Sequence, residues 1–250
     1  MYYVISDIHG CHAEMMDALS HWDKENETLI VLGDLIDRGP DSLNVVQTLR
    51  ELKEVAPDRV VVLKGNHDES FTAWLLDTPE EELGFYYMPS HEETVRSFYG
   101  YDPENVQKCK RDSRKQRGQH IRHLFIKELH FLARLPMVHE TENCIFVHAG
   151  INLNIQDWRD DERCMNEIRN PFIYSKKQAP KRVFFGHTPT GLIRDDKSDC
   201  SIWMSDHGDK IGIDGGCVFG RQLNALKVSE DGDIMQTIAI HKKTGASLCV

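Results

Sequence analysis

The sequence lacks the marks of membrane proteins and of disulfide-rich secreted proteins. No apolar run approaches the roughly 20 residues that a membrane-spanning helix needs, and the N-terminus lacks the basic and then apolar layout of a signal peptide. Its seven cysteines are odd in number and scattered, and no C-x-x-C pair occurs. We therefore expect a cytoplasmic protein without a membrane partner, a disulfide framework or a thiolate zinc site.

Positive charge is also in short supply. The chain has 30 lysines and arginines against 40 acidic residues, a net charge of -10, which argues against nucleic acid as a partner. No cysteine is followed six positions later by an arginine, which excludes the phosphatases that use a cysteine nucleophile. Flexible linkers and internal repeats are absent as well. With 250 residues, we expect a single domain over 1–250.

Short apolar runs alternate with helical patterns in the first third of the chain. Strands are predicted over 2–6, 28–32 and 59–63, because each run is apolar and bounded by turn residues. Helices are predicted over 11–22 and 40–54, after the first two strands. Such repeated strand and helix units predict a parallel sheet with its functional groups at the carboxyl ends of the strands.

The pattern changes in the middle of the chain. Residues 78–135 are charged and helical in tendency, most clearly over 119–132, and predict a mostly helical cap insertion within the domain. Strands resume at 144–147 and 182–185. Short alternating segments follow and predict antiparallel strands. They lie at 201–204, 210–213, 223–228 and 234–240.

Side chains able to bind metal ions follow five of the expected strands. These residues are Asp7 and His9, Asp34, Asn66 and His67, His148, and His187. Buried carboxylates at strand ends are costly unless something compensates their charge, and a metal ion is the usual compensation. The mixture of carboxylate, carboxamide and imidazole groups suits Mn²⁺, Fe²⁺ or Zn²⁺ better than thiophilic ions. The sequence therefore predicts a metal centre built from several strand ends.

The segment Gly33-Asp34-Leu35-Ile36-Asp37-Arg38-Gly39 carries two acids and an arginine on one turn. Because Asp34 and Asp37 are three residues apart on a loop, Asp34 could hold a metal ion while Asp37 serves a neighbour. Arg38 offers a planar cation suited to phosphate. The alternative for Asp37 and Arg38 is a mutual ion pair at the surface.

Together these motifs resemble those of the calcineurin-like metallophosphoesterases. The resemblance rests on Asp7-x-His9-Gly10, Gly33-Asp34-x-x-Asp37-Arg38-Gly39, Gly65-Asn66-His67-Asp68, the later His148, and Gly186-His187-Thr188. It covers most of residues 1–226 and is nearest to the phosphoprotein phosphatase branch, which includes the lambda phage phosphatase. It implies an α/β (α+β) fold, a β-sandwich of two mixed sheets flanked by helices, in which 78–135 form the insertion.

The resemblance also implies two divalent metal ions as cofactors, for which we expect Mn²⁺, with iron or zinc as alternatives. Asp7 and His9 would bind the first ion and Asp34 would bridge the two. The ligands of the second ion would be Asn66, His148 and His187. A hydroxide shared between the ions would attack phosphorus directly, without a phosphoenzyme.

Catalytic and substrate-binding roles follow from the same resemblance. His67 would act as general acid, with Asp37 holding its other ring nitrogen. Arg38 would bind phosphate oxygens. A second phosphate-binding arginine is expected, with Arg169 as the candidate and Arg194 as the alternative. The family often has a tryptophan shortly before that arginine, where this chain has Asn166 and Glu167.

These expectations lead to a metal-dependent phosphomonoesterase. We expect a serine/threonine protein phosphatase whose substrates are phosphorylated proteins, with phosphotyrosine or phosphorylated small molecules as further substrates. A dinucleoside polyphosphate hydrolase acting on diadenosine tetraphosphate is the alternative, because it shares the metal motifs. A non-catalytic scaffold is disfavoured, since every motif is retained. The basic segment 108–122, with seven cations against one acid, would recruit an acidic substrate or form a solvated helical face.

Overall fold

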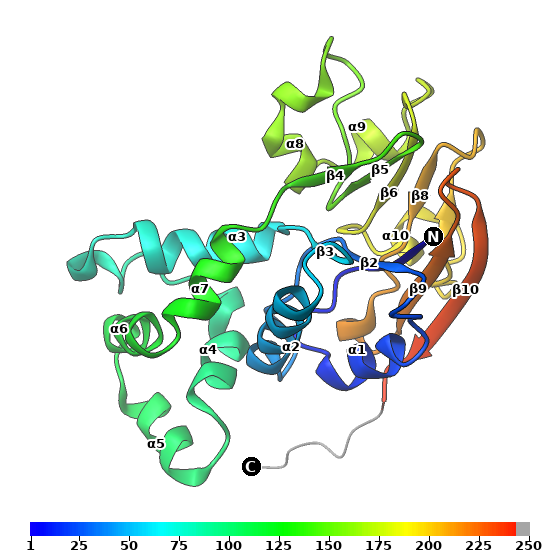
Figure 1. The fold of residues 1–250 in the computed structure, drawn as a ribbon. Helices are drawn as coiled ribbons and strands as arrows, with labels where there is room; N and C mark the ends of the chain where they lie inside the picture. The colour runs from blue at the N-terminus through cyan, green and yellow to red at the C-terminus, as the bar shows by residue number, and fades with distance from the viewer. Residues whose placement is uncertain (244–250) are drawn as a thin grey trace.

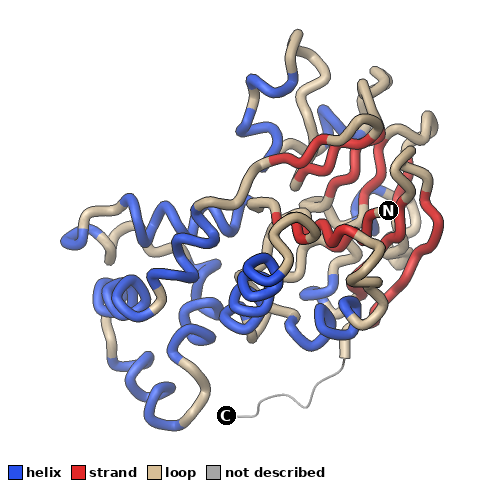
Figure 2. The backbone as a smooth tube through the Cα atoms, viewed as in Figure 1, coloured by secondary structure: helices blue, strands red, loops and turns tan. Residues whose placement is uncertain are grey.

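Two five-stranded sheets pack face to face in the computed structural model, which describes residues 1–243 (Figure 1). Helices lie outside the pair of sheets, and most of the helical residues gather in one lobe beside them (Figure 2). The fold is therefore the predicted one, two mixed sheets flanked by helices.

The first sheet has the order β10-β9-β1-β2-β3. Its strands are β1 (Tyr2–Ile5), β2 (Thr28–Val31), β3 (Val60–Val62), β9 (Gln222–Val228) and β10 (Ile234–His241). The first three run parallel, as their alternation with helices predicted, and β9 and β10 run antiparallel. The carboxyl ends of β1, β2 and β3 therefore meet at one edge.

The second sheet has the order β4-β5-β6-β8-β7. Its strands are β4 (Val138–Glu140), β5 (Cys144–Val147), β6 (Arg182–Phe185), β7 (Trp203–Met204) and β8 (Lys210–Gly212). The antiparallel prediction after residue 200 is correct for β7 with β8 and for β9 with β10, but it is wrong for β8 with β6, which run parallel. The chain between β6 and β8 is long enough to cross over and return in the same direction.

Alternation along the strands divides the core into layers. Val4 of β1 and Ile30 of β2 face the second sheet and pack with Phe146 and Phe184. Tyr3 and its outward neighbours instead face the helices. Because side chains point alternately to the two faces of a strand, each buried strand serves both layers. The outer face of the second sheet is covered by η4 (Trp158–Asp160), α8 (Glu162–Glu167), α9 (Asn170–Ile173) and α10 (Thr190–Ile193).

The helices of the first sheet start near the strand ends. They are α1 (His12–Leu19), α2 (Ser42–Val55) and α3 (Asn66–Thr72). α1 stops before the predicted end at residue 22, because the chain turns there and the Trp22 indole donates to the carbonyl of Glu27 at 3.0 Å. α3 begins directly after the third strand, so its first residues stand at the edge where the parallel strands end.

The insertion is a set of short helices in the lobe beside the sheets (Figure 1). They are η2 (Glu80–Glu82), η3 (Pro89–His91), α4 (Glu92–Tyr99), α5 (Pro103–Arg111), α6 (Arg114–Leu124) and α7 (Ile126–Ala133). The short helix η1 (Ala73–Asp77) precedes the insertion. The single helix predicted over 119–132 is wrong: Phe125 leaves the helical conformation (φ -120°, ψ 33°) and its ring packs on Phe98 at 5.0 Å. Since Phe98 belongs to the same core cluster as Tyr3, we propose that the insertion is part of one domain.

Two expectations from the sequence concern membrane-spanning helices and disulfide bonds. Within residues 1–243, no helix is long and apolar enough to cross a membrane. The six cysteines in that stretch carry free thiols. Cys249 lies outside the described residues.

Candidate metal centre and active site

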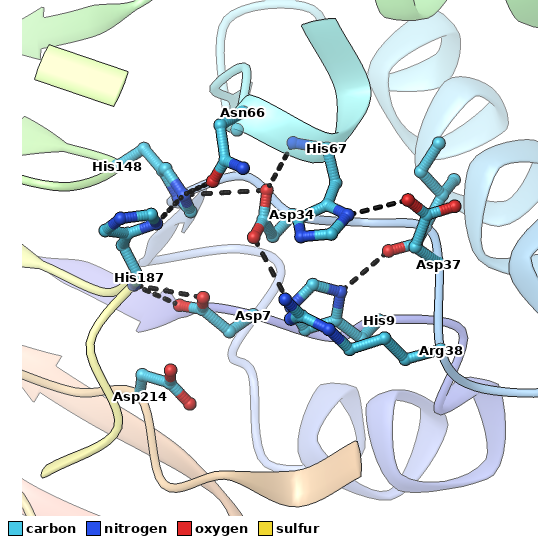
Figure 3. A network of polar contacts seen from close by, with 12 residues as sticks. Asp7, His9, Asp34, Asp37, Arg38, Asn66, His67, His148, His187 and Asp214 are labelled. Atoms are coloured by element: carbon cyan, nitrogen blue, oxygen red, sulfur yellow. Dashed lines mark hydrogen bonds and ion pairs between the residues drawn. The ribbon is translucent and has the colours of Figure 1, made fainter. Parts of the chain in front are cut away.

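The strand ends bring the expected ligands into one place (Figure 3). Ligand atoms of His9, Asp34 and His67 lie within 4.8 Å of one another, and so do those of Asp34, His148 and His187. Asp34 belongs to both groups. A carboxylate with two oxygens can serve two cations at once, so this arrangement suits a pair of ions that share Asp34.

Backbone strain is concentrated at the site. Among residues 1–243, six non-glycine residues have φ between 44° and 72°, in the left-handed region. They are Asp7, His9, Asp34, Asp37, Arg38 and His187, all of them candidate site residues. Each such conformation costs about 1–3 kcal/mol and persists only where the surroundings hold it. Here neighbouring loops hold each other, for example through the bond from the N–H of His9 to the carbonyl of Asp34 at 2.9 Å.

Two glycines allow the loops to approach this closely. A Cβ atom on Gly65 would overlap the backbone nitrogen and the carboxylate of Asp34. A Cβ atom on Gly186 would overlap the carboxylate of Asp7. The glycines that precede Asn66 and His187 in the sequence therefore make room for the acids rather than bind anything themselves.

The group around His148 tests whether a cation fits. Its Nδ1 donates to the carbonyl of Leu32 at 2.9 Å, so Nε2 carries a lone pair. That Nε2 lies 3.2 Å from Asn66 Oδ1, 3.2 Å from His187 Nδ1 and 3.5 Å from Asp34 Oδ1. Three acceptor atoms, His148 Nε2, Asn66 Oδ1 and Asp34 Oδ1, thus converge on one another, which is favourable if a cation binds between them. The donor set therefore fits a divalent metal ion.

His9, in the first group of ligand atoms, is oriented in the same way as His148. Its Nδ1 donates to the carbonyl of Ile36 at 2.7 Å, which leaves Nε2 as an acceptor facing Asp34 Oδ2 at 3.3 Å and the Arg38 guanidinium at 2.5 Å. Burial lowers the pKa of His9 to about 4 and that of His187 to about 2. Neutral imidazole is the form that binds metal ions.

Acidic groups crowd the centre. Burial raises the pKa of Asp7 well above its usual range, and the charges of Asp214 and Asp34 raise it further. Burial and Asp34 likewise raise the pKa of Asp214 to about 7. Asp7 belongs to neither of the two close groups; its carboxylate accepts from the N–H of His187 at 3.0 Å. Bound cations would compensate this buried negative charge.

His67 is held as a general acid requires. Its Nδ1 lies 2.6 Å from Asp37 Oδ2, and its backbone N–H donates to Asp34 Oδ1 at 3.0 Å. Burial alone would lower the pKa of His67, but the hydrogen bond to Asp37 and the charge of Asp34 outweigh it, so that pKa is raised. The structure thus pairs Asp37 with His67, and Arg38 contacts His9 rather than Asp37.

The two candidate second arginines differ sharply. Arg169 donates to the carbonyl of His187 and to Thr188 Oγ1, both at 3.0 Å, which places it beside the second group of ligands. Arg194 is tied by an ion pair of 2.7 Å to Asp199 and also donates to loop carbonyls. The geometry therefore favours Arg169 over Arg194.

Three contributors were not expected from the sequence. The insertion residues His91 and Thr94 both bind the carboxylate of Asp37. Asp68 accepts from the N–H groups of Leu35 (3.1 Å) and Gly65 (2.9 Å), so it ties two strand-end loops together. His91 belongs to no motif in the sequence, and only tertiary packing brings it to the site.

A family model of the calcineurin-like phosphoesterases matches residues 2–217. The chain belongs to this family. Calcineurin-like phosphoesterases are hydrolases that act on phosphoester bonds and depend on two metal ions, in agreement with the two ligand groups. The resemblance expected from the motifs is therefore confirmed at the level of the family.

Relatives within the family include two tetraphosphatases. The asymmetrical bis(5′-nucleosyl)-tetraphosphatase PrpE of Anoxybacillus flavithermus is 27% identical over an alignment of 267 positions. The alignment covers 96% of this chain and 94% of that protein. The symmetrical bis(5′-nucleosyl)-tetraphosphatase of Buchnera aphidicola is 47% identical over 73 residues, so this chain spans only 25% of its length. A crystal structure of a putative diadenosine tetraphosphatase shares the fold, with a TM-score of 0.58, 19% identity and coverage of 98% of this chain and 94% of that one.

Proposed function

We propose that this chain is a metal-dependent hydrolase of dinucleoside tetraphosphates. The match to PrpE over nearly the whole of both chains carries this proposal. It favours the diadenosine tetraphosphate alternative over the serine/threonine protein phosphatase that the motifs first suggested. Membership in the phosphoprotein phosphatase branch stays a prediction.

The residues divide the work of hydrolysis between them. One metal ion would be held by Asp7, His9 and Asp34, and the other by Asp34, Asn66, His148 and His187. When bound, the ions supply Lewis-acid charge for the phosphate oxygens and activate water. His67 donates a proton to the departing phosphate oxygen, and Asp37 keeps its ring in position. Arg38 and Arg169 bind non-bridging oxygens.

An exposed aromatic ring beside the site supports a nucleotide substrate. Phe219, at the end of η5 (Cys217–Phe219), is 58% exposed, and the Arg38 guanidinium lies 5.4 Å from its ring centre. Every nucleobase has an aromatic face that can stack on such a ring. A phosphate bound by Arg38 would leave the attached nucleoside within reach of Phe219.

Product analysis tests the proposal. The protein is incubated with Mn²⁺ and either diadenosine tetraphosphate or phosphoserine, phosphothreonine and phosphotyrosine peptides, with His67→Asn as the inactive control. We expect ATP and AMP from the dinucleotide and intact peptides. Two ADP molecules would assign symmetrical cleavage instead. Phosphate released from peptides, with the dinucleotide intact, would restore the protein phosphatase. No hydrolysis of either, or of p-nitrophenyl phosphate, would favour the scaffold.

The metal assignment has a separate test. We propose Mn²⁺ as the native ion, because the ligand set combines carboxylate, carboxamide and imidazole groups without thiolate. Protein stripped with a chelator should bind two Mn²⁺ ions per chain in calorimetry. Tighter binding of Zn²⁺ or Fe²⁺ together with higher activity would replace Mn²⁺ in this assignment. One ion per chain would contradict a centre built on a shared Asp34.

A further inference from the structure

The carboxylate of Asp37 is held from two sides. One side is His67, whose Nδ1 lies 2.6 Å from Oδ2. The other side is the insertion: His91 Nδ1 lies 2.9 Å from Oδ2 and 3.1 Å from Oδ1, and Thr94 Oγ1 donates to Oδ1 at 2.7 Å. The Asp37 side chain is fully buried. No part of this carboxylate is therefore left to solvent, and its position is set by these three partners.

Thr94 fixes the backbone of Asp37 as well as its side chain. While its hydroxyl donates to the carboxylate, the oxygen accepts from the backbone N–H of Asp37 at 2.8 Å. Ser42 Oγ lies 3.2 Å from the same hydroxyl. Asp37 is one of the residues with a left-handed backbone, at φ 72°. A bond to both its N–H and its carboxylate holds that strained conformation in place.

His91 donates a hydrogen bond to Asp37. A carboxylate only accepts hydrogen bonds, so Nδ1 of His91 carries the proton. Its Nε2 is buried and has no partner among residues 1–243. The ring is clamped between Trp74, stacked at 14°, and Phe71, edge-on at 5.2 Å. His91 therefore donates to Asp37 from a ring whose position is fixed by aromatic packing.

The insertion is anchored beside this contact by an independent hydrogen bond. His91 ends η3 and Thr94 lies in the first turn of α4. One turn further along α4, Ser97 Oγ accepts from the N–H of Leu43 at 2.9 Å, which ties α4 to α2. Since α4 is fixed to α2, its donors meet Asp37 at a defined distance.

We propose that His91 and Thr94 are positioning residues for catalysis, through which the helical insertion sets the orientation of His67. This inference rests on the proposed role of His67 as general acid. It assigns the insertion a part in the chemical step, in addition to any role in substrate binding. Misplacing a catalytic group by about 1 Å can lower the rate about a hundredfold, and an unreactive leaving group depends most on a well-placed proton donor.

The test compares leaving groups. His91→Leu and Thr94→Val remove the donors, whereas His91→Asn and Thr94→Ser keep one. With both metals bound, we expect kcat for phenyl phosphate, whose leaving phenol has a pKa of about 10, to fall about tenfold to a hundredfold in the first two variants. The loss should be smaller for p-nitrophenyl phosphate, because its leaving group is more acidic. The conservative variants should recover most of the rate.

A double variant separates positioning from general damage. In the His67→Asn background, adding His91→Leu should lower kcat little further, because the histidine that His91 positions is already absent. Ser97→Ala is the matched control on α4: it loosens the same helix without touching Asp37, so the ratio of rates on the two substrates should not change. Thermal unfolding identifies any variant that fails to fold, and Thr94→Val then replaces His91→Leu.

The outcomes distinguish two failures. If His67→Asn hydrolyses both substrates as fast as the parent enzyme, the general acid assignment is wrong and the proposed mechanism with it. If His67→Asn is impaired but His91→Leu and Thr94→Val match the parent, only the positioning role is wrong. If the His91 and Thr94 variants lose kcat equally on both substrates, and lose it again in the His67→Asn background, these residues have a structural role and the inference is overturned.

Discussion

The strand-end loops and the helical insertion reach the same carboxylate by different routes. The loops present Asp37 on a strained turn between Gly33 and Gly39, where the backbone of Arg38 is also left-handed. The insertion approaches from outside the sheet and offers His91 and Thr94 as donors. The loops supply the reactive groups and the insertion limits their freedom. Strain in one region is therefore stabilised by packing in the other.

The two regions also differ in how they hold their own shape. The loops are joined by direct bonds between neighbours, such as the one from the N–H of Gly10 to the carbonyl of Leu35 at 2.9 Å. The insertion depends on aromatic packing, with Phe98 touching Phe71 and Phe125. Damage to the loops should therefore affect chemistry first, and loss of the aromatic packing in the insertion should affect stability first.

Asp34→Asn should have the largest effect, because this carboxylate belongs to both ligand groups. The substitution keeps the shape and removes a shared negative charge. We expect turnover of diadenosine tetraphosphate to fall on the order of 10⁴-fold, equivalent to about 5 kcal/mol of activation barrier. Metal analysis should find fewer than two ions per chain. Full metal content and activity in this variant would remove Asp34 from the centre.

His67→Asn should follow, with a loss on the order of 10²–10⁴ for phenyl phosphate. Here the metal content should stay unchanged, since the ring points to Asp37 and its removal leaves the other ligands in place. The loss should shrink with p-nitrophenyl phosphate. A loss of bound metal in this variant would instead make His67 a ligand, as its closeness to His9 and Asp34 also allows.

Phe98→Ala tests the insertion by its packing. Removing this buried ring should cost about 3–5 kcal/mol of unfolding free energy, measured by denaturant. Because Phe98 shares a core cluster with Tyr3 of the sheet, we expect one cooperative transition. Two separate transitions would make the insertion an independent unit. Phe85→Ala, at a ring that is 84% exposed, is the control and should change stability by less than about 0.5 kcal/mol.

Arg169→Ala should have the smallest effect, confined to substrate binding. Losing one charge-assisted bond to phosphate should raise KM about tenfold. Arg194→Ala serves as the comparison, because Arg194 is committed to Asp199 and should leave KM unchanged. The opposite result, with KM raised only by Arg194→Ala, would exchange the roles of the two arginines.

The basic segment of the insertion is partly used within the fold. Arg117 pairs with Glu92 at 3.1 Å, and Arg122 donates to the carbonyls of Leu75 and Thr78. Lys110 and Arg111 remain exposed. Part of the basic segment thus stabilises the fold. Periodicity and net charge could not reveal this, because they take no account of tertiary partners.

The second sheet shows why the local sequence pattern was enough to predict some of the main strands. β5 (Cys144–Val147) and β6 (Arg182–Phe185) have the bounds that their apolar runs predicted. Such runs must be buried wherever they lie, so their hydrophobicity is a local property. β4 escaped prediction because Val138–Glu140 is only half buried and carries no apolar run. The break at Phe125 escaped as well, since it comes from packing on Phe98.

The sequence by itself determined most of the strands, the polar residue at each strand end, and the kinds of side chain offered to a metal ion. These depend on residue type and on the rule that parallel strands end at one edge. Only the tertiary structure decided that Arg169 rather than Arg194 lies beside the ligand groups, and that His91 reaches Asp37. Those contacts join residues far apart in the chain, and their distances are fixed by packing rather than by spacing in the sequence.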